Sequence, residues 1–592
     1  VNVAGCDLNL AIVYEQLNRF QEALALYPQA LRAGAPIPEI VWKSRYGLGR
    51  VYQGQNRPRA AYRHLGRAIQ TLETLRGALP QEQVLSPFFE DKIGVYREMV
   101  ATCLAFQRTD RALEYVERSK SRNLLELLAR QDLRPQETVP QGLVDAYSRL
   151  RLELRGLRYR LTQEQGAEAP AQTKAEIEKA EAEYDRTLKE IRAHDGDFTA
   201  TVRVEPISLK QIQELLPDEE TALVEFFLTG EQILAFVVTQ GGISHQVIEG
   251  FTPQDLADQW RKWFEEYQRF RAYHDRRAWF QTLDAVLKEL YERMFAQVRE
   301  ALPASIRKLV LIPYQYLHFF PLHALYREEN GQRRYLLEDY DISYAPSASV
   351  LKRCQERGKR GKEKLFAVSD PDGSLEDSRE EVEAIQAWFE EKLILGNPPK
   401  GKEVAYAPAT VERCLEEPPA YHVIHFACHG LYDFSDPLRS HLQLSDGELT
   451  LGEIFARLHI PRSCLVVLSA CETGITELSR ADEWVGLAGG FLHAGAPTVL
   501  SSLWAVADHS TSLLMQQVYD HFLNQGKSVV QALNEVQRAF IRGEITWASA
   551  QGQEKFGLMA SPHSVPEERD EKALEDYRHP YYWAAFTVSG VG

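Results

Sequence analysis

The sequence predicts a multidomain protein in which an α-helical solenoid precedes an α/β domain with a mostly parallel sheet. The chain has 592 residues, which at about 150 residues per domain gives three or four units. Small and aromatic residues recur at a fixed spacing in residues 1–130, a pattern typical of stacked helical pairs. Short apolar runs alternate with helical segments in residues 361–592, a pattern typical of a parallel sheet.

Residues 1–130 carry the pattern of tetratricopeptide (TPR) repeats, in which small residues let two helices touch and aromatic residues fill the gap to the next pair. The first copy comprises Ala11, Tyr14, Ala23, Tyr27 and Ala30. The second copy, 38 residues later, comprises Gly49, Tyr52, Ala61, Leu65 and Ala68. A third, degraded copy comprises Met99, Cys103, Ala112 and Val116. Such a solenoid commonly binds a peptide or partner helix on its concave face, and the alternative is that it only braces the next domain.

A charged helical linker is expected in residues 131–205. A long helix over residues 114–128 leaves the repeats, and the segment from Gln131 to Pro135 breaks it. Residues 143–192 form two charged amphipathic patterns that are interrupted at residues 166–170. We expect an antiparallel hairpin that braces the structure and carries no chemistry.

Residues 206–360 change to a strand pattern. Apolar runs at residues 222–228, 233–238 and 243–248 are separated by Thr-Gly and Gly-Gly pairs, which predicts a β-meander that packs against the last domain. Helical segments follow in residues 253–301, and their aromatic residues are expected in the core rather than at a ligand. These aromatic residues are Trp260, Trp263 and Phe264.

A buried strand in the last domain leads directly to the thiol of Cys471. Residues 465–468 are apolar without alternation, which is typical of a central parallel strand covered on both faces. Ligands collect beyond the carboxyl ends of such strands, and Gly474 frees the backbone to turn there. Cys471 is therefore a candidate nucleophile, and the alternative is a small core cysteine.

A second apolar strand, residues 421–427, leads in the same way to His429 and Gly430. If the two strands are parallel neighbours, both tips open on one edge of the sheet, where the imidazole reaches the thiol. A thiolate nucleophile, with histidine as base and then as acid, is the minimum equipment of a cysteine protease. Gly430 lets a substrate carbonyl approach, and the N–H groups of Gly430 and Cys471 are candidate oxyanion donors. The sequence requires no carboxylate or amide as a third catalytic residue beside His429 and Cys471.

The motifs at residues 425–430 (His-Phe-Ala-Cys-His-Gly) and 468–474 (Leu-Ser-Ala-Cys-Glu-Thr-Gly) resemble those of the CHAT family. This family comprises caspase-like peptidases that are related to separases and often fused to TPR repeats. Further blocks similar to the family's lie at residues 309–325, 343–349, 494–504 and 579–586. The resemblance therefore covers roughly residues 305–590, and six blocks in order make it specific.

The resemblance implies a caspase-like fold with a pseudo-protease half in residues 206–360 and a catalytic half in residues 361–592. The implied function is a cysteine endopeptidase that cleaves a specific protein and is regulated through its TPR arm. The alternative is a catalytically silent scaffold that only assembles other proteins.

The position of Asp508 predicts that the enzyme prefers substrates with arginine or lysine immediately before the cleaved bond. A pocket for a guanidinium group needs a carboxylate that forms a bidentate pair. Asp508 follows an apolar strand at residues 498–503 and is expected at the same sheet edge as Cys471. The segment is similar to the Leu-Trp-x-Val-x-Asp segment of separases, which cleave after arginine, although Ala505 replaces a second aspartate found there.

Two other acidic residues are reserve candidates for this pocket. Asp482 and Glu483 lie in the loop that follows Cys471. The alternative for Asp508 is structural, because aspartate also serves well as the N-cap of a helix beginning at His509.

A metal site is the third hypothesis for the last domain. Its candidate ligands are His422, His425, Cys428 and His429. Alternation along a strand sends these side chains to opposite faces, which argues against a metal and turns Cys428 away from His429. Seven cysteines without a CxxC pair indicate a reducing compartment, not a disulfide framework or a zinc site. No cofactor is predicted.

Composition and charge indicate a soluble, cytoplasmic protein. No apolar run approaches the ~20 residues of a membrane span, and no signal peptide is present. Val1 in place of methionine indicates a trimmed chain. We expect that further repeats preceded the present ones before trimming. Residues 1–130 carry a net charge of +5 from 18 Lys/Arg and 13 Asp/Glu. Because the whole chain carries −16, the remaining residues carry −21. We expect a protein substrate and a regulatory protein or peptide on the TPR arm, without direct nucleic-acid or membrane binding.

Two charged segments carry lesser expectations. The basic run at residues 359–364 is expected to be a solvated loop, and the alternative is a self-cleavage site. Residues 548–577 read as a charged, flexible insertion.

Overall fold

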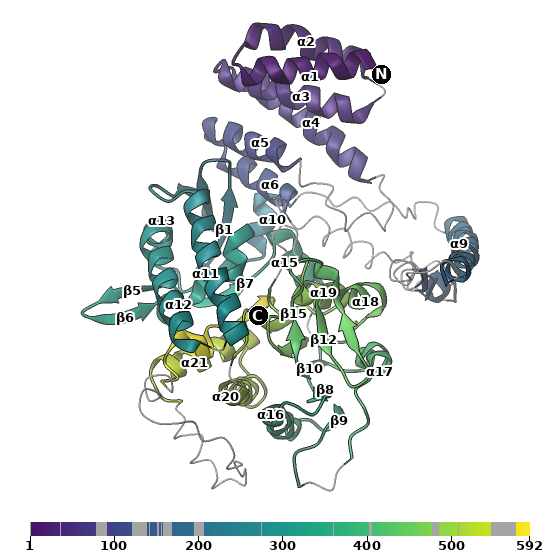
Figure 1. Ribbon diagram of the computed structural model, residues 1–592, viewed down its shortest axis with the longest axis vertical. Coiled ribbons are helices and arrows are strands. Elements are labelled where there is room, and N and C mark those ends of the chain that lie inside the picture. Colours follow the sequence, from purple (N-terminus) through teal and green to yellow (C-terminus); the bar gives the residue numbers. More distant parts are fainter. Residues whose placement is uncertain are drawn as a thin grey trace.

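A computed structural model places an N-terminal helical region beside an α/β domain (Figure 1). It describes residues 2–35, 37–77, 92–120, parts of 139–157, 169–194, 207–273, 275–358, 360–401, 405–475, 485–506, 508–545 and 576–591. The reserve candidates Asp482 and Glu483 and the insertion at residues 548–575 lie outside these ranges.

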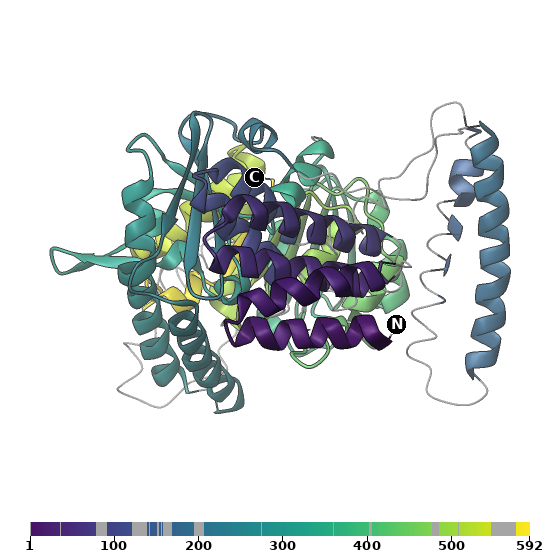
Figure 2. The same ribbon diagram turned by 90° about the horizontal axis from the view of Figure 1, so that it is seen from above.

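The described part of the N-terminal region consists of antiparallel helical pairs that stack along the chain, as Figure 2 shows from above. The pairs are α1 (Asn2–Gln16) with α2 (Phe20–Ala33), α3 (Pro38–Gly54) with α4 (Pro58–Gly77), and α5 (Ile93–Ala105) with α6 (Thr109–Ser119). Buried alanines lie where helices meet, among them Ala11, Ala23 and Ala61, because a methyl group permits close helix contact. The assignment to the TPR class stays a prediction.

Helix α6 ends at Ser119, nine residues before the predicted end of a long helix at Leu128. Lys120 is extended (φ −99°, ψ 147°) and its side chain is fully buried. Its Nζ lies 3.3 Å from Oε1 of Glu225 and donates to the carbonyl of Pro313 at 3.2 Å. The buried ammonium group therefore accompanies the end of α6, where propensity alone would continue the helix. Residues 121–138 lie outside the described part.

The linker contains helix α9 (Ala169–His194). Tyr184 of α9 stacks on Tyr147 at 5.5 Å between ring centroids. Ile191 joins Val139 and Tyr147 in a small apolar cluster. These contacts fit the predicted hairpin, whose turn lies outside the described residues.

The α/β domain is built on an eleven-stranded sheet of order β3-β2-β1-β4-β7-β16-β15-β14-β10-β8-β9. The strands are β1 (Thr221–Leu228), β2 (Ile233–Thr239), β3 (Gly242–Val247), β4 (Lys308–Ile312), β7 (Asp341–Tyr344), β8 (Lys364–Ser369), β9 (Glu391–Gly396), β10 (Val423–Ala427), β14 (Leu465–Ser469), β15 (Thr498–Ser502) and β16 (Phe586–Gly590).

Two parallel blocks of opposite direction meet in this sheet. Strands β1, β4, β7 and β16 run parallel to one another, and so do β15, β14, β10, β8 and β9. The antiparallel pair β16–β15 joins the blocks. The sheet is therefore mostly parallel, as predicted.

The predicted meander is present as the antiparallel strands β1, β2 and β3. It extends the sheet through backbone pairing of β1 with β4, whereas the sequence predicted that it packs against the domain. Residues 206–360 thus supply the first parallel block apart from β16.

Helices cover both faces of the block that contains Cys471 and His429. Helices α16 (Glu376–Gln386) and α20 (Asp508–Tyr519) lie on one face, and α17 (Val411–Glu416), α18 (Leu451–Arg457) and α19 (Leu487–Ala494) lie on the other. Alternate residues of β10 and β14 enter the two apolar clusters, so Val467 packs on one side and Val466 on the other. This two-sided burial explains the unbroken apolar runs in the sequence.

The remaining elements connect or flank the sheet. The helices are α10 (Leu209–Glu214), α11 (Pro253–Tyr273), α12 (Arg276–Leu290), the π-helical turn η2 (Tyr291–Phe295), α13 (Ala296–Ala301), α14 (Leu336–Asp339), α15 (Ala348–Glu356), α21 (Val529–Ile541) and α23 (Pro580–Trp583). The small strands are β5 (Tyr326–Glu329) with β6 (Gln332–Tyr335), and β11 (Gly430–Leu431) with β12 (His441–Gln443) and β13 (Glu448–Thr450).

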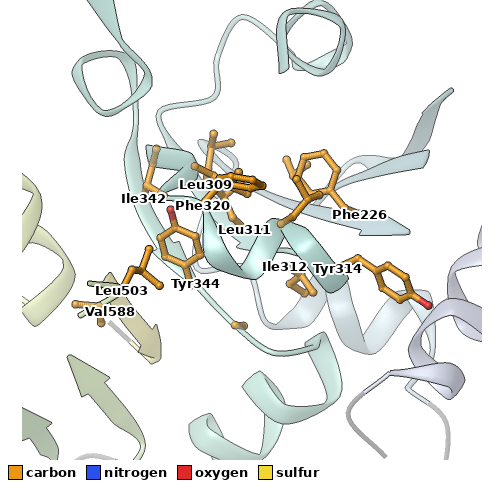
Figure 3. Packing of buried hydrophobic residues seen from close by; sticks show 14 of the residues in the cluster. Phe226, Leu309, Leu311, Ile312, Tyr314, Phe320, Ile342, Tyr344, Leu503 and Val588 are labelled. Carbon is orange, nitrogen blue, oxygen red and sulfur yellow. The ribbon is translucent and has the colours of Figure 1, made fainter. Parts of the chain in front are cut away.

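One apolar core joins the two blocks (Figure 3). Phe226 of β1, Tyr344 of β7 and Val588 of β16 lie in the same cluster as Leu503, which follows β15 on the other side of the junction. The cluster extends into α4, α5 and α6, so the last helical pairs share the core of the α/β domain. Trp263 of α11 is buried there as predicted, whereas Trp260 and Phe264 are partly buried at its border.

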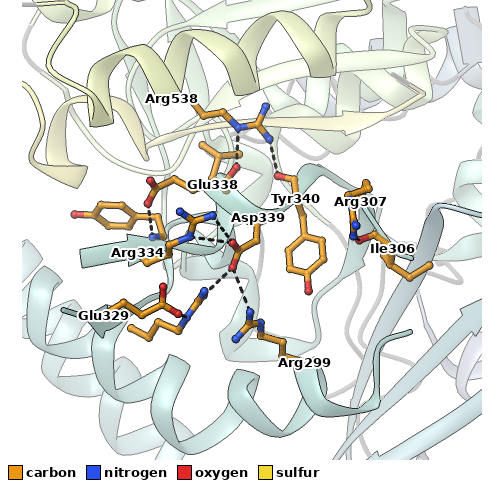
Figure 4. A network of polar contacts seen from close by, with 12 residues as sticks. Arg299, Ile306, Arg307, Glu329, Arg334, Glu338, Asp339, Tyr340 and Arg538 are labelled. Carbon is orange, nitrogen blue, oxygen red and sulfur yellow. Dashed lines mark hydrogen bonds and ion pairs between the residues drawn. The ribbon is translucent and has the colours of Figure 1, made fainter. Parts of the chain in front are cut away.

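Asp339 is the centre of a polar network that fixes the β5–β6 hairpin (Figure 4). Its carboxylate accepts hydrogen bonds from Arg327 at 2.7 Å and from Arg334 at 2.9 and 3.0 Å. Arg538 of α21 donates to the carbonyl of Tyr340 at 2.9 Å. The network borders an open pocket of about 780 Å³ whose lining includes none of the predicted site residues.

Residues 360–363 of the basic run form a partly exposed loop that leads into β8, which fits the predicted loop, but two of its basic side chains bind neighbouring backbone instead of being fully solvated. Arg360 donates to the carbonyls of Ser463 at 2.6 Å and Gly495 at 2.9 Å, at the amino ends of β14 and β15. Lys362 donates to the carbonyl of Phe522 at 3.1 Å. Cleavage after Arg360 would first have to break these contacts, at the sheet edge opposite Cys471. Lys359 is outside the described residues.

In the described part of the chain, no helix is both long and apolar enough to cross a membrane.

Candidate active site

Strands β10 and β14 bring His429 and Cys471 to one edge of the sheet. The strands are parallel neighbours, and the last pair in their register is Ala427 with Ser469. His429 and Cys471 each follow that pair by two residues. Because the register is shared, the two side chains leave the sheet at the same level.

Gly430 lies directly against the loop of the nucleophile candidate. A Cβ atom at this position would stand 2.5 Å from the carbonyl oxygen of Cys471 and 3.0 Å from Cγ2 of Thr473. A side chain here would push the two loops apart. The sequence assigned Gly430 to the approach of a substrate carbonyl, whereas the structure shows that it admits the backbone of Cys471.

Exposure separates the two cysteines near this edge. The His429 side chain is 47% exposed and Cys471 is partly exposed. Cys428 is only 2% exposed and lies in the apolar cluster on the other face of the sheet, as strand alternation predicted. Burial raises the pKa of the Cys428 thiol well above its usual value, which keeps it protonated.

A third loop reaches the same edge and contacts His429. It follows β8, which is the parallel neighbour of β10 on the side away from β14. Ser374 Oγ lies 2.7 Å from Nε2 of His429 and donates to Oδ1 of Asp372 at 2.9 Å. Since the hydroxyl proton of Ser374 goes to Asp372, Ser374 accepts the Nε2 proton of His429. The tautomer with a proton on Nε2 leaves Nδ1 as the basic nitrogen.

Asp372 adds negative charge near the imidazole. Its Oδ2 lies 3.9 Å from Nε2 of His429. Although burial raises the pKa of Asp372, the hydrogen bonds from Ser374 and the nearby His429 outweigh it, so the pKa lies below its usual value. The aspartate is therefore ionised at neutral pH and places a negative charge near the imidazole.

Asp370 holds this third loop in place. Its side chain is fully buried, accepts from the N–H of Leu375 at 2.9 Å and pairs with Arg379 at 2.5 Å. Its own N–H donates to the carbonyl of Ala427 at the end of β10. The loop that carries Ser374 is therefore tied directly to the strand that carries His429.

The sequence analysis missed Asp372 and Ser374, although a signal was present. The strand at residues 365–369 was predicted, and the polar segment Asp-Pro-Asp-Gly-Ser at residues 370–374 follows it directly. The rule that selected Cys471 and His429, a polar group just beyond a buried parallel strand, selects this segment as well.

Glu472 is a third residue that the sequence analysis did not single out. It is 2% exposed, and Oε1 accepts from the hydroxyl of Tyr267 at 2.7 Å and pairs with Arg271 at 3.0 Å. Oε2 accepts from the N–H of Tyr432 at 3.2 Å. An acidic residue inside an otherwise apolar and small-residue motif was the available signal.

The turn after β14 also differs from the prediction in one detail. Glu472, not Gly474, has the left-handed backbone conformation, with φ of 61°. Gly474 is required for close approach, because its Cβ would lie 3.1 Å from the carbonyl of Ser502. Its N–H donates to that carbonyl at 2.7 Å, which ties the turn to β15.

The side chains of the predicted specificity residues lie outside the described part of the structure. Asp508 is the first residue of α20, and its side chain lies outside the described part. Its roles as pocket carboxylate and as helix cap both stay predictions, as do those of Asp482 and Glu483.

The four residues of the metal hypothesis point in different directions. His425 is fully buried against Glu381 at 2.9 Å and Tyr519 at 3.1 Å. His422 lies at the opposite edge, 3.0 Å from Glu363, and Cys428 and His429 diverge as described above. Among the residues that the structure describes, no three His, Cys, Asp or Glu side chains are placed to hold a metal ion.

A comparison with protein-family models identifies the α/β domain. A model of the CHAT domain matches residues 284–591. Two structures of the Saccharomyces cerevisiae separase–securin complex align with 99% of this chain at 11% and 10% identity and TM-scores of 0.43 and 0.42. The chain spans about half of those separase chains, 49% and 50%.

A more distant match is the Arg-specific cysteine proteinase gingipain R, at 9% identity and a TM-score of 0.31. It covers 52% of this chain and 67% of the proteinase. No curated protein sequence matches the chain.

The site geometry predicts that Cys471 is far more reactive than Cys428. At pH 7, iodoacetamide should alkylate Cys471 at least about tenfold faster than exposed Cys6, because a neighbouring imidazole promotes the thiolate. Cys428 should stay unmodified in the folded protein. Peptide mapping by mass spectrometry measures all three rates, and His429→Ala should slow Cys471 to the rate of Cys6. Equal rates at Cys471 and Cys6 in the wild type would contradict the arrangement.

Proposed function

The chain belongs to the CHAT-domain family, and from this premise we propose that it is a cysteine endopeptidase with His429 and Cys471 as its catalytic dyad. One observation supports the proposal most strongly, the shared register of β10 and β14, which places both residues two positions beyond the last strand pair. The partial exposure of both side chains leaves room for a substrate.

In the proposed reaction, Nδ1 of His429 takes the proton of the Cys471 thiol, and the thiolate attacks the substrate carbonyl. Ser374 and Asp372 hold the Nε2 proton and stabilise the imidazolium that forms. The N–H groups of Gly430 and Cys471 are the proposed donors to the oxyanion. The imidazolium then protonates the leaving amine, and water hydrolyses the acyl-enzyme.

A catalytically silent scaffold is the rival function. A pure assembly domain has no need for an exposed histidine whose Nε2 proton is held by a hydroxyl and a nearby carboxylate. This contact therefore favours the enzyme, and the dyad variants below separate the two functions.

We place the protein in a reducing compartment such as the cytoplasm. None of the seven cysteines, all of which lie in the described ranges, forms a disulfide, and a catalytic thiolate also requires reducing conditions.

The N-terminal arm is the proposed binding site of a regulatory protein or peptide. Its last helix is coupled to the α/β domain by Glu117, which accepts from the N–H groups of Ala348 at 2.7 Å and Ser349 at 2.9 Å. Lys120 adds the buried contact with Glu225. A partner that shifts α5 and α6 would thereby act on the sheet.

Single substitutions of the dyad test the activity itself. Cys471→Ala and His429→Ala should each lower kcat/KM by at least about 10³-fold, because nucleophile and base act as a unit. The double variant should be hardly worse than either single variant. Turnover is measured by mass spectrometry on a random peptide library. Cys428→Ala is the matched control and should retain most activity, whereas full turnover in either dyad variant would exclude the mechanism.

Substrate preference tests the proposed pocket at Asp508. Peptides with Arg or Lys before the bond should be cleaved in preference to those with Asp or Leu. Asp508→Ala should lower kcat/KM for the Arg peptide by roughly 10²-fold, since the guanidinium group of the peptide loses its carboxylate partner. Asp520→Ala is the control, because Asp520 directly follows the C-terminal end of α20, the helix that begins at Asp508. Cleavage after Asp, or an Arg preference indifferent to Asp508→Ala, would count against this pocket.

Regulation is tested by shortening the arm. Removal of residues 1–130 would expose the core shared with α4, α5 and α6, so the suitable variant lacks only residues 1–34, helices α1 and α2. We expect a changed basal rate or a lost response to a partner captured on the full chain. Thermal unfolding confirms that the variant is folded. An unchanged rate together with an unchanged response would exclude this role for α1 and α2.

A further inference from the structure

The carboxylate of Glu472 connects the two halves of the proposed dyad. Glu472 directly follows Cys471, and its Oε2 accepts from the N–H of Tyr432, three residues after His429. One oxygen therefore reaches across from the nucleophile's loop to the histidine's loop. Gly430 permits this short distance by letting the loops touch.

The backbone at Glu472 depends on side-chain contacts. Its φ of 61° lies in the left-handed region, which a non-glycine residue seldom adopts without compensation. The compensation comes from Tyr267 at 2.7 Å and Arg271 at 3.0 Å, both on Oε1. If these contacts were lost, the turn would relax and carry Cys471 with it.

Both Oε1 partners come from helix α11 (Pro253–Tyr273). This helix precedes residues 284–591, the segment that the CHAT domain model matches. Tyr267 is fully buried, and burial, with the charge of Glu472 in addition, raises its pKa well above the usual value, so its hydroxyl stays protonated. While donating to Glu472, it accepts from the N–H of Ala505 at 3.2 Å.

Tyr267 thus joins two loops of the proposed site. One is the turn that carries Cys471, and the other is the segment after β15 that leads from Leu503 to Asp508. Arg271 is 29% exposed and closes the outer side of the Glu472 carboxylate. Helix α11, the turn after β14 and the segment after β15 therefore meet at the Tyr267 hydroxyl and the Glu472 carboxylate.

We propose that Glu472 is a positioning residue that sets the separation of Cys471 and His429, and that Tyr267 and Arg271 of α11 hold it in place. The inference rests on the proposed function for the dyad. In this proposal, α11 helps to position the dyad although it lies outside the segment that the CHAT model matches.

The test measures the alkylation of Cys471 by iodoacetamide between pH 5 and 9 in the full-length chain, which requires no knowledge of the substrate. In Glu472→Gly, Glu472→Ala and Tyr267→Phe, the rate at pH 7 should fall about tenfold, towards that of His429→Ala, because the imidazole no longer stands by the thiol. The midpoint of the pH profile should move towards that of an ordinary thiol. Cys6 provides the internal reference rate.

Two comparisons separate positioning from a loss of fold. Glycine accepts the left-handed backbone, so Glu472→Gly should unfold at a higher temperature than Glu472→Ala and yet show the same loss of Cys471 reactivity. Arg269→Ala, an exposed arginine two residues before Arg271, should match the wild type in rate and profile. In peptidase assays, the Glu472 variants should lower kcat with little change in KM.

The inference is overturned if folded Glu472→Gly and Tyr267→Phe alkylate Cys471 with the wild-type rate and pH profile. A wild type that cleaves no peptide but shows His429-dependent alkylation would remove the proposed peptidase function and leave the positioning role intact. The two failures are therefore distinguishable.

Discussion

The parallel pairing of β10 with β14 is the constraint on which the rest of the site depends. Backbone hydrogen bonds fix which residue lies beside which, and the register Ala427 with Ser469 leaves the same number of residues before His429 and Cys471. A slip by one residue would turn one of the two side chains to the other face of the sheet. Burial of alternate residues in two separate apolar clusters resists such a slip, because it would place apolar and polar positions on the wrong sides.

The edge of the sheet gathers groups from strands that are distant in sequence. Ser374 follows β8, His429 follows β10, Cys471 follows β14, and Ala505 follows β15. Buried hydrogen bonds tie neighbouring loops and strands together, such as those of Asp370 to Ala427 and Glu472 to Tyr432. Fixed loops of this kind hold a catalytic group in one geometry, which a mobile loop cannot do.

Buried polar contacts attach the end of α6, in the last described helical pair of the N-terminal arm, to the α/β domain. Lys120 and Glu225 are both fully buried, and burial together with the neighbouring Glu117 raises the pKa of Glu225 well above its usual value. Removing one group of such a buried pair is strongly destabilising. Glu117 adds hydrogen bonds to the first turn of α15, whose helix dipole favours a carboxylate there. A signal from the arm therefore has a physical route to the sheet, through the position of α6.

The sequence by itself determined the strands that lead to His429 and Cys471, the meander at residues 221–247 and the order of helical region and α/β domain, because these follow from local periodicity. It also placed Cys428 on the opposite face, since alternation is a property of any strand. Only the tertiary structure decided that α6 ends where Lys120 is buried, that the meander continues the sheet and that Glu472 meets Tyr267 of α11. These features depend on which groups meet across 87 to 205 residues of chain, and no local pattern encodes the partner of a buried charge.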